Sequence, residues 1–151
     1  MKPRHLFFFL LASLILSGCS YQHYFIIGNS SNETITIKYS LDTTVGSNVI
    51  FDRRGEVYQS TSDYFPDWEH KLAFKDLDNS DNAIWIELAP KNTLVFGTLS
   101  NDGYDKNTMK SASGKVFNLN EMTFTVNGVD YTINKDNFHD FFLEDSGTHK
   151  Y

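Results

Sequence analysis

The side chain with the greatest chemical reactivity in this sequence belongs to its single cysteine, Cys19. An ionised thiol is a stronger nucleophile than a hydroxyl, so it is the group best able to take up an alkyl chain. Cys19 directly follows the small residues Ser17 and Gly18 at the end of an apolar run. Small residues at such an exit are typical of a peptidase cleavage site. The pattern therefore predicts that Cys19 is modified and that the chain is cleaved beside it.

The segment before Cys19 has the composition of a secretory signal. Residues 1–5 carry Lys2 and Arg4 and no acid, and residues 6–16 are apolar except for one serine. This run has 11 residues, whereas a helix needs about 20 apolar residues to span a bilayer. A charged head, a short apolar run and a small-residue exit indicate a removable signal peptide. We expect it to cover residues 1–18.

Leu16-Ser17-Gly18-Cys19 resembles the lipobox of bacterial lipoproteins. The resemblance covers only the first 20 residues, and it implies a diacylglyceryl thioether on Cys19, cleavage before Cys19 and acylation of the new amine. Two or three acyl chains hold a protein durably at a membrane, whereas one chain binds only marginally. The resemblance thus implies a permanent lipid anchor. The alternative is an ordinary signal peptide followed by an incidental cysteine.

The residues after Cys19 indicate where in the cell envelope the protein is located. In Gram-negative lipoproteins, aspartate at the next position favours the inner membrane, so Ser20 implies the outer membrane. Residues 21–24 contain no acidic cluster of the kind that accompanies surface exposure in some lipoproteins. Residues 19–23 are predicted to form the lipidated cysteine and a short tether, which reaches about 15 Å when extended. We expect the domain to face the periplasm, or the exterior in a host with one membrane.

The remaining composition indicates one globular domain at residues 24–151. Removal of the signal leaves 133 of the 151 residues, enough for one hydrophobic core. The whole chain has a formal charge of −6, and loss of the signal removes two further basic side chains. This acidic balance argues against nucleic acid as a partner and against a polybasic membrane contact. With its only cysteine lipidated, the domain has no disulfide or thiolate metal site, and no cofactor is predicted.

Alternating apolar and polar residues predict most of the strands. The clearest strand covers residues 34–41, where the odd positions are apolar from Ile35 onward. Residues 122–126 and 129–133 alternate on either side of Asn127-Gly128, which is the strongest local signal for a two-residue hairpin. Weaker patterns predict strands at 24–27, 48–52, 56–59, 83–88 and 94–99, with a turn at 53–55 between the second and third of these.

Together these elements indicate an all-β fold. Three phenylalanines in residues 136–143 lie at positions i, i+3 and i+4, which predicts a short helix on the sheet. Residues 101–115 are expected to form a polar loop, and residues 60–82 fit either a strand or an irregular covering segment ending in a polar loop. Seven or eight short strands favour a single β-sandwich (Ig-like or jelly-roll-like) or a small barrel with a short C-terminal helix.

One acidic segment has the spacing of a calcium loop. Oxygen-bearing side chains alternate from Asp76 to Asn82, and Glu87 stands at the twelfth position of that register. However, Asp81 stands where the sharp turn requires glycine, and residues 83–86 read as a strand instead of a helix. We therefore interpret the segment as a solvated acidic turn and predict no metal site.

No recognised catalytic motif occurs in the sequence. It contains no Gly-x-Ser-x-Gly elbow and no phosphate-binding glycine loop. The histidines of the domain are scattered: His23, His70, His139 and His149. We therefore predict a protein that is not an enzyme. The alternative is a hydrolase that acts on envelope glycan or peptide through carboxylates and His70 or His139, since carboxylate pairs need no motif.

Several large side chains in the middle of the chain form a candidate binding face. Arg53, Tyr58, Tyr64 and Trp68 are of the types that dominate binding surfaces. The competing interpretation is that the aromatic residues mostly fill the core. The sequence thus favours a non-catalytic, lipid-anchored envelope protein whose β-domain binds a protein or glycan partner.

Overall fold

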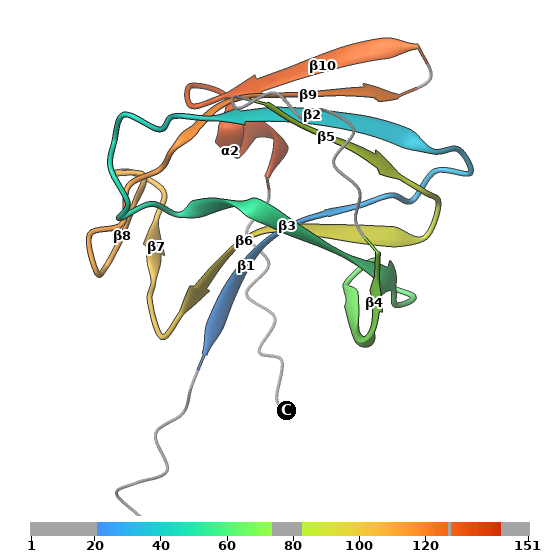
Figure 1. Cartoon of the computed structure of the whole chain (residues 1–151), viewed down its shortest axis with the longest axis horizontal. Coiled ribbons are helices and arrows are strands. Elements are labelled where there is room, and N and C mark those ends of the chain that lie inside the picture. Colours follow the sequence, from blue (N-terminus) through green and yellow to red (C-terminus); the bar gives the residue numbers. More distant parts are fainter. Residues whose placement is uncertain (1–20, 74–82, 127, 143–151) are drawn as a thin grey trace, which may run out of the picture.

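A computed structural model describes residues 21–73, 83–126 and 128–142, with residues 52–54 described by their backbone alone. Figure 1 shows a compact arrangement of strands with one short helix, α2. Among the described residues, no helix is long and apolar enough to cross a membrane. Cys19 and the signal segment lie outside the described residues, as does the acidic segment 76–82.

Ten strands and one helix make up the described chain. In chain order they are β1 Gln22–Gly28, β2 Ile35–Leu41, β3 Phe51–Ser60, β4 Pro66–Leu72, β5 Ala83–Leu88, β6 Asn92–Ser100, β7 Tyr104–Asp105, β8 Lys110–Ser111, β9 Leu119–Val126, β10 Val129–Asn134 and α2 Phe138–Phe141.

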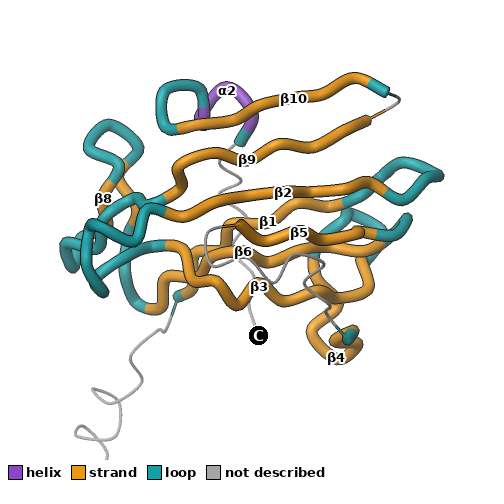
Figure 2. The backbone as a smooth tube through the Cα atoms, turned by 45° about the horizontal axis from the view of Figure 1, so that its top comes forward, coloured by secondary structure: helices purple, strands orange, loops and turns teal. Residues whose placement is uncertain are grey.

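The strands form two facing antiparallel sheets, which makes the fold a β-sandwich. One sheet has the strand order β1-β6-β3-β4 and the other β10-β9-β2-β5, while β7 and β8 form a small separate hairpin. The two layers are visible in Figures 1 and 2. The sandwich prediction is therefore confirmed, and the sheets do not close into a barrel. Because β5 and β6 belong to different sheets, the turn at Pro90-Lys91 carries the chain from one layer to the other.

The hydrophobic core lies between the two sheets. The predicted alternation in β2 places Ile35, Ile37 and Tyr39 in the core and leaves the residues between them exposed. The ring of Phe51 is central to the core, with neighbouring rings on several sides at centroid distances of 5.0–5.1 Å: Phe25, Phe96 and Phe117. Gly97 allows this packing, because a Cβ atom there would lie 2.7 Å from the Phe51 ring.

The predicted C-terminal hairpin is confirmed. β9 and β10 pair from Val126↔Val129 to Glu121↔Asn134, so only two residues form the turn. Gly128 has a positive φ of 75°, which is the conformation that the primed two-residue turns require. Met122 and Ile133 pair across the hairpin and are fully buried.

The prediction of two strands joined by a turn at residues 53–55 was wrong. One strand, β3, runs from Phe51 to Ser60 without reversing direction. Phe51 pairs with Gly97 and Glu56 pairs with Val95, so four residues of β3 oppose the single residue Phe96 of β6. The Arg53-Arg54-Gly55 segment has the composition of a turn. However, the residues before and after it pair with β6, which keeps it in the sheet as a long bulge.

The C-terminal helix is shorter than predicted. α2 contains one turn, Phe138–Phe141, instead of the segment 136–143, of which Leu143 lies outside the described residues. A turn precedes it, because the side-chain oxygen of Asn137 accepts a hydrogen bond from the Asn134 N–H at 2.7 Å. Such local side-chain bonds favour turns over helix.

Two segments contain more structure than their composition indicates. The segment 60–82, for which the sequence left two possibilities, contains strand β4. The polar segment 101–115 contains the short β7–β8 hairpin. In addition, β1 begins at Gln22, two residues before its predicted start and within the segment 19–23 assigned to the tether.

Candidate functional site

Three aromatic side chains meet on the outer face of the β1-β6-β3-β4 sheet. The ring of Trp68 on β4 lies 4.7 Å from that of Tyr24 on β1 and 5.1 Å from that of Tyr58 on β3. Trp68 is 38 % exposed and Tyr58 is 7 % exposed, so the indole forms the accessible surface of the group. We call Tyr24, Tyr58 and Trp68 the aromatic platform.

The platform exists because the β3–β4 hairpin curls back over its own sheet. Figure 1 shows β4 turning away from the plane of β3. The pairing of β3 with β4 shifts register after Tyr58, which bends the hairpin. The turn is fixed to the sheet, because the Thr93 hydroxyl on β6 donates a hydrogen bond to the Tyr64 carbonyl at 2.8 Å. As a result Thr93 of the central strand β6 is buried on the outer face.

The hydroxyl groups of the platform are held by polar neighbours. The Tyr24 hydroxyl donates to Gln22, and the Tyr58 hydroxyl donates to Glu56 at 2.6 Å. Lys71 forms a salt bridge with the same carboxylate, and its ammonium lies 6.0 Å above the Tyr58 ring. These contacts fix the two tyrosine rings that support the indole.

The same contacts shift two pKa values. The hydrogen bonds from Lys71 and then Tyr58 hold the pKa of the Glu56 carboxyl below its ordinary value. Burial, helped by the hydrogen bond to Glu56, raises the pKa of Tyr58 to about 12. Near neutral pH the group therefore contains an ionised carboxylate and a neutral phenol.

The structure brings together part of the predicted binding face. Tyr58 and Trp68 are in contact, and Tyr64 lies in the turn of the same hairpin with 42 % of its surface exposed. Arg53 lies in the β3 bulge, where only the backbone is described. Sequence reasoning missed Tyr24, although its alternation with buried Phe25 in a predicted strand places it on an outer face.

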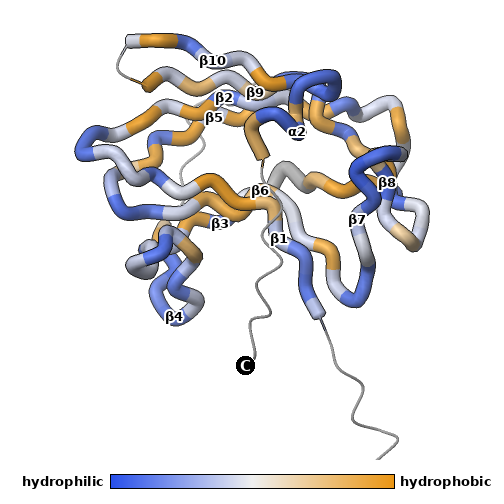
Figure 3. The backbone as a smooth tube through the Cα atoms, turned by 180° about the vertical axis from the view of Figure 1, so that it is seen from behind, coloured by the Kyte–Doolittle hydropathy of each residue, from blue (hydrophilic) through white to orange (hydrophobic). Residues whose placement is uncertain are grey.

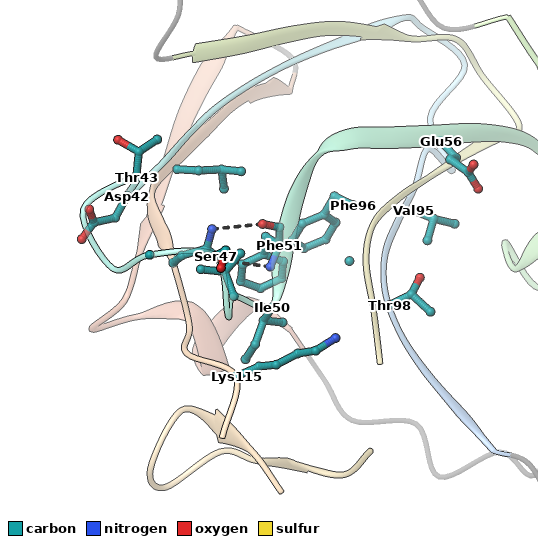
Figure 4. A pocket seen from close by; sticks show the side chains of 15 residues that line it. Asp42, Thr43, Ser47, Ile50, Phe51, Glu56, Val95, Phe96, Thr98 and Lys115 are labelled. Carbon is teal, nitrogen blue, oxygen red and sulfur yellow. Dashed lines mark hydrogen bonds between the residues drawn. The ribbon is translucent and has the colours of Figure 1, made fainter. Parts of the chain in front are cut away.

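A cavity with a volume of about 630 Å³ lies beside the β3 bulge. Its polar lining includes Asp42, Glu56 and Lys115, and Figure 4 shows the two carboxylates on opposite sides of it. Asn118 closes one wall, because its side-chain amide accepts from the Phe51 N–H at 2.9 Å and donates to the Phe51 carbonyl at 3.0 Å.

The two carboxylates of this cavity both have a lowered pKa. Hydrogen bonds from the Thr44 hydroxyl and N–H hold the pKa of Asp42 below its ordinary value, and that of Glu56 is lowered as well. A general acid for glycoside hydrolysis needs a raised pKa. Both groups here are held as ions.

The two histidines of the hydrolase alternative lie in different parts of the domain. His70 Nδ1 is 2.8 Å from Asp67 on β4, but its side chain is 57 % exposed and lines none of the described cavities. His139 on α2 lies 3.3 Å from the Tyr104 hydroxyl. Among the described residues, no group of three or more histidine, cysteine or acidic side chains could hold a metal ion.

We expect the fluorescence of Trp68 to respond to the ionisation of Glu56. The carboxylate holds Tyr58 and Lys71 beside the indole, and its folded-state pKa lies below the ordinary value of 4.5. The interaction is therefore present above that value and lost as pH falls through the lower folded-state pKa. In a Trp85→Phe background, the Trp68 emission should change with a midpoint below 4.5, and Glu56→Gln should abolish the change. A midpoint at or above 4.5 would contradict the described contacts.

Comparison of this chain with protein families, with curated proteins and with solved structures gives no match.

Proposed function

We propose that this chain is a lipid-anchored envelope protein whose β-sandwich binds a glycan through the aromatic platform, without catalysing a reaction. The observation that carries the proposal is the position of Trp68, whose ring is held between Tyr24 and Tyr58 yet remains 38 % exposed. A rigid, exposed indole offers apolar contact area at a low cost in conformational entropy.

The polar groups around the indole favour a glycan over a protein partner. Glu56 and Lys71 form an ion pair beside Tyr58, and Asp67 and His70 flank Trp68 on β4. The centres of protein interfaces are depleted in charged residues. A sugar, in contrast, presents hydroxyl groups that can donate to carboxylates and accept from an ammonium. The platform therefore combines an apolar face for a ring with polar groups for its hydroxyls.

The anchoring part of the proposal is supported by the sequence. The lipobox resemblance supports lipid attachment at Cys19, and Ser20 supports the outer membrane, with the domain facing the periplasm in a Gram-negative host. The short distance along the chain from Cys19 to the start of β1 keeps the platform close to that membrane.

Trp68→Ala is expected to weaken glycan binding at least about tenfold, because truncation of a central aromatic anchor costs about 2 kcal/mol or more. The measurement is co-sedimentation of the purified protein with isolated cell-wall glycan, followed by an array of envelope oligosaccharides. Trp85→Ala is the matched control, since Trp85 is 37 % exposed on the opposite sheet, where Lys38 lies 4.9 Å above its ring. That variant should bind as the parent does.

Two outcomes would contradict the glycan proposal. Equal losses in Trp68→Ala and Trp85→Ala would show that the platform has no special role. If no glycan binds, and if the parent and Trp85→Ala cross-link to one envelope protein while Trp68→Ala does not, the partner is a protein instead of a glycan. Release of soluble fragments from the glycan, abolished by Glu56→Gln, would support the hydrolase alternative instead.

A further inference from the structure

A second, smaller cavity lies where β1, β7 and α2 meet, and Tyr24 is the one residue that it shares with the aromatic platform. Its volume is about 220 Å³. Figure 3 shows the three elements on this side of the sandwich. Phe25, Phe138 and Phe142 provide apolar lining. The polar lining comes from three separate parts of the chain: His23 on β1, Tyr104 on β7, Lys106 in the turn after β7 and His139 on α2.

The polar side chains of this cavity are arranged around the phenol of Tyr104. The Tyr104 hydroxyl lies 3.3 Å from Nε2 of His139, and the ring of His23 lies 6.1 Å from the Tyr104 ring on centroids. Burial, with a contribution from the charge of Asp105, raises the pKa of Tyr104 to about 12. The phenol therefore stays neutral and can donate a hydrogen bond.

The charges around this cavity favour an anion. Its lining includes one lysine and two histidines but no carboxylate, in a chain with a net charge of −6. The acids nearest in sequence, Asp105 and Asp140, are exposed. Asp105 is already engaged by the Asn107 N–H and the Thr108 hydroxyl, both at 2.9 Å. The groups that face the cavity are thus a lysine, two imidazoles and a phenol.

We propose that this cavity binds a phosphate group, with Lys106, His23, His139 and the Tyr104 hydroxyl as its donors. A phosphate has several acceptor oxygens and takes charge-assisted hydrogen bonds from such groups. The cavity is smaller than the sites that hold drug-sized ligands. It therefore suits a head group whose remainder extends into solvent or into a membrane surface.

Two sources could supply this phosphate: the head group of an anionic phospholipid, or a soluble phosphate ester. β1 begins three residues after Cys19, so a lipid anchor there would hold His23 within about 15 Å of the head groups. The choice of source rests on the proposed anchor, whereas phosphate binding itself does not.

The first experiment titrates the purified full-length protein, in uncharged detergent, with inorganic phosphate at pH 6. Histidine side-chain NMR should show saturable shifts of His23 and His139. Lys106→Gln should weaken the apparent affinity roughly tenfold, as expected for loss of one charge-assisted bond. His70→Gln, an exposed histidine outside the cavity, is the matched control and should leave the affinity unchanged.

Unshifted His23 and His139 resonances, or equal weakening by Lys106→Gln and His70→Gln, would overturn the proposal. Lipid nanodiscs identify the source. If the ligand is a lipid head group, nanodiscs of phosphatidylglycerol should shift the two resonances by themselves and added phosphate should have no further effect. If it is a soluble ester, added phosphate should act equally in anionic and zwitterionic nanodiscs. The detergent titration needs neither lipid attachment nor Trp68, so its failure is distinguishable from failure of the glycan proposal.

Discussion

Replacement of Cys19 by alanine is expected to leave an uncleaved precursor or a soluble protein that has no lipid anchor. Without the thiol there is no acceptor for the diacylglyceryl group, and in lipoproteins cleavage follows that modification. Each buried methylene of an acyl chain contributes about 0.8 kcal/mol, so loss of two or three chains removes membrane affinity on the order of 10 kcal/mol or more. Intact mass and membrane fractionation measure the two effects.

The matched control for this experiment is Ser20→Ala, which leaves the cysteine and the small residues before it in place. It should remain lipidated and bound to the membrane. An unmodified amine on the mature parent protein, or survival of its residues 1–18, would contradict the lipid anchor. Digestion of the domain by protease on intact cells would contradict the predicted orientation towards the periplasm.

Phe138→Ala is expected to lower the free energy of unfolding by about 3–5 kcal/mol, a large part of the roughly 5–15 kcal/mol that stabilises a typical domain. Phe138 is 1 % exposed and anchors α2 in the core. Its ring lies 4.9 Å from that of Phe117 and 4.2 Å from that of Phe142. Urea denaturation measured by circular dichroism should show a lower midpoint with a similar slope.

Phe141→Ala is the control for this effect, because it removes the same side chain from the same helical turn at a position that is 42 % exposed. The centroid of the Phe141 ring lies 6.4 Å from those of Phe124 and Tyr131 on the β9–β10 hairpin. We expect a loss below about 1.5 kcal/mol, as partial exposure limits the area returned to water. Similar losses for the two variants would show that α2 does not fill the core.

The sequence predicted the elements whose pattern depends on near neighbours. The alternation around Ile37 identified β2, and Asn127-Gly128 located the turn between β9 and β10. In both cases the local sequence pattern agrees with the observed burial. The apolar positions face the core and the polar positions face solvent, whichever strands lie beside them. The all-β sandwich followed from the number of such strands.

Features that depend on contacts distant in sequence were not predictable in this way. The Arg53-Arg54-Gly55 segment reads as a turn, and only its pairing to β6 on both sides makes it a bulge. Asn118 is polar and yet buried, because its amide pairs with the backbone of Phe51, 67 residues away.

The aromatic platform was predicted in part for the same reason. Tyr58 and Trp68 are close in sequence and belong to one hairpin, so they could be grouped from the sequence. Tyr24 joins them only because β1 and β3 both pair with β6 and β4 curls across the outer face. Strand order and hairpin curvature cannot be predicted from the local amino-acid composition.

If the chain is anchored at Cys19 as proposed, the pairing of β1 with β6 has a mechanical consequence. β1 forms seven residue pairs with β6, from Gln22↔Ser100 to Gly28↔Thr93, and is the first strand after Cys19. Antiparallel ladder bonds lie across the strands, so tension along β1 is shared by the whole ladder at once instead of opening it one bond at a time. Tyr24 is on this strand. A pulling force between the membrane and a ligand on Trp68 would therefore reach β1 through the β4, β3 and β6 pairings and load the β1–β6 ladder in shear.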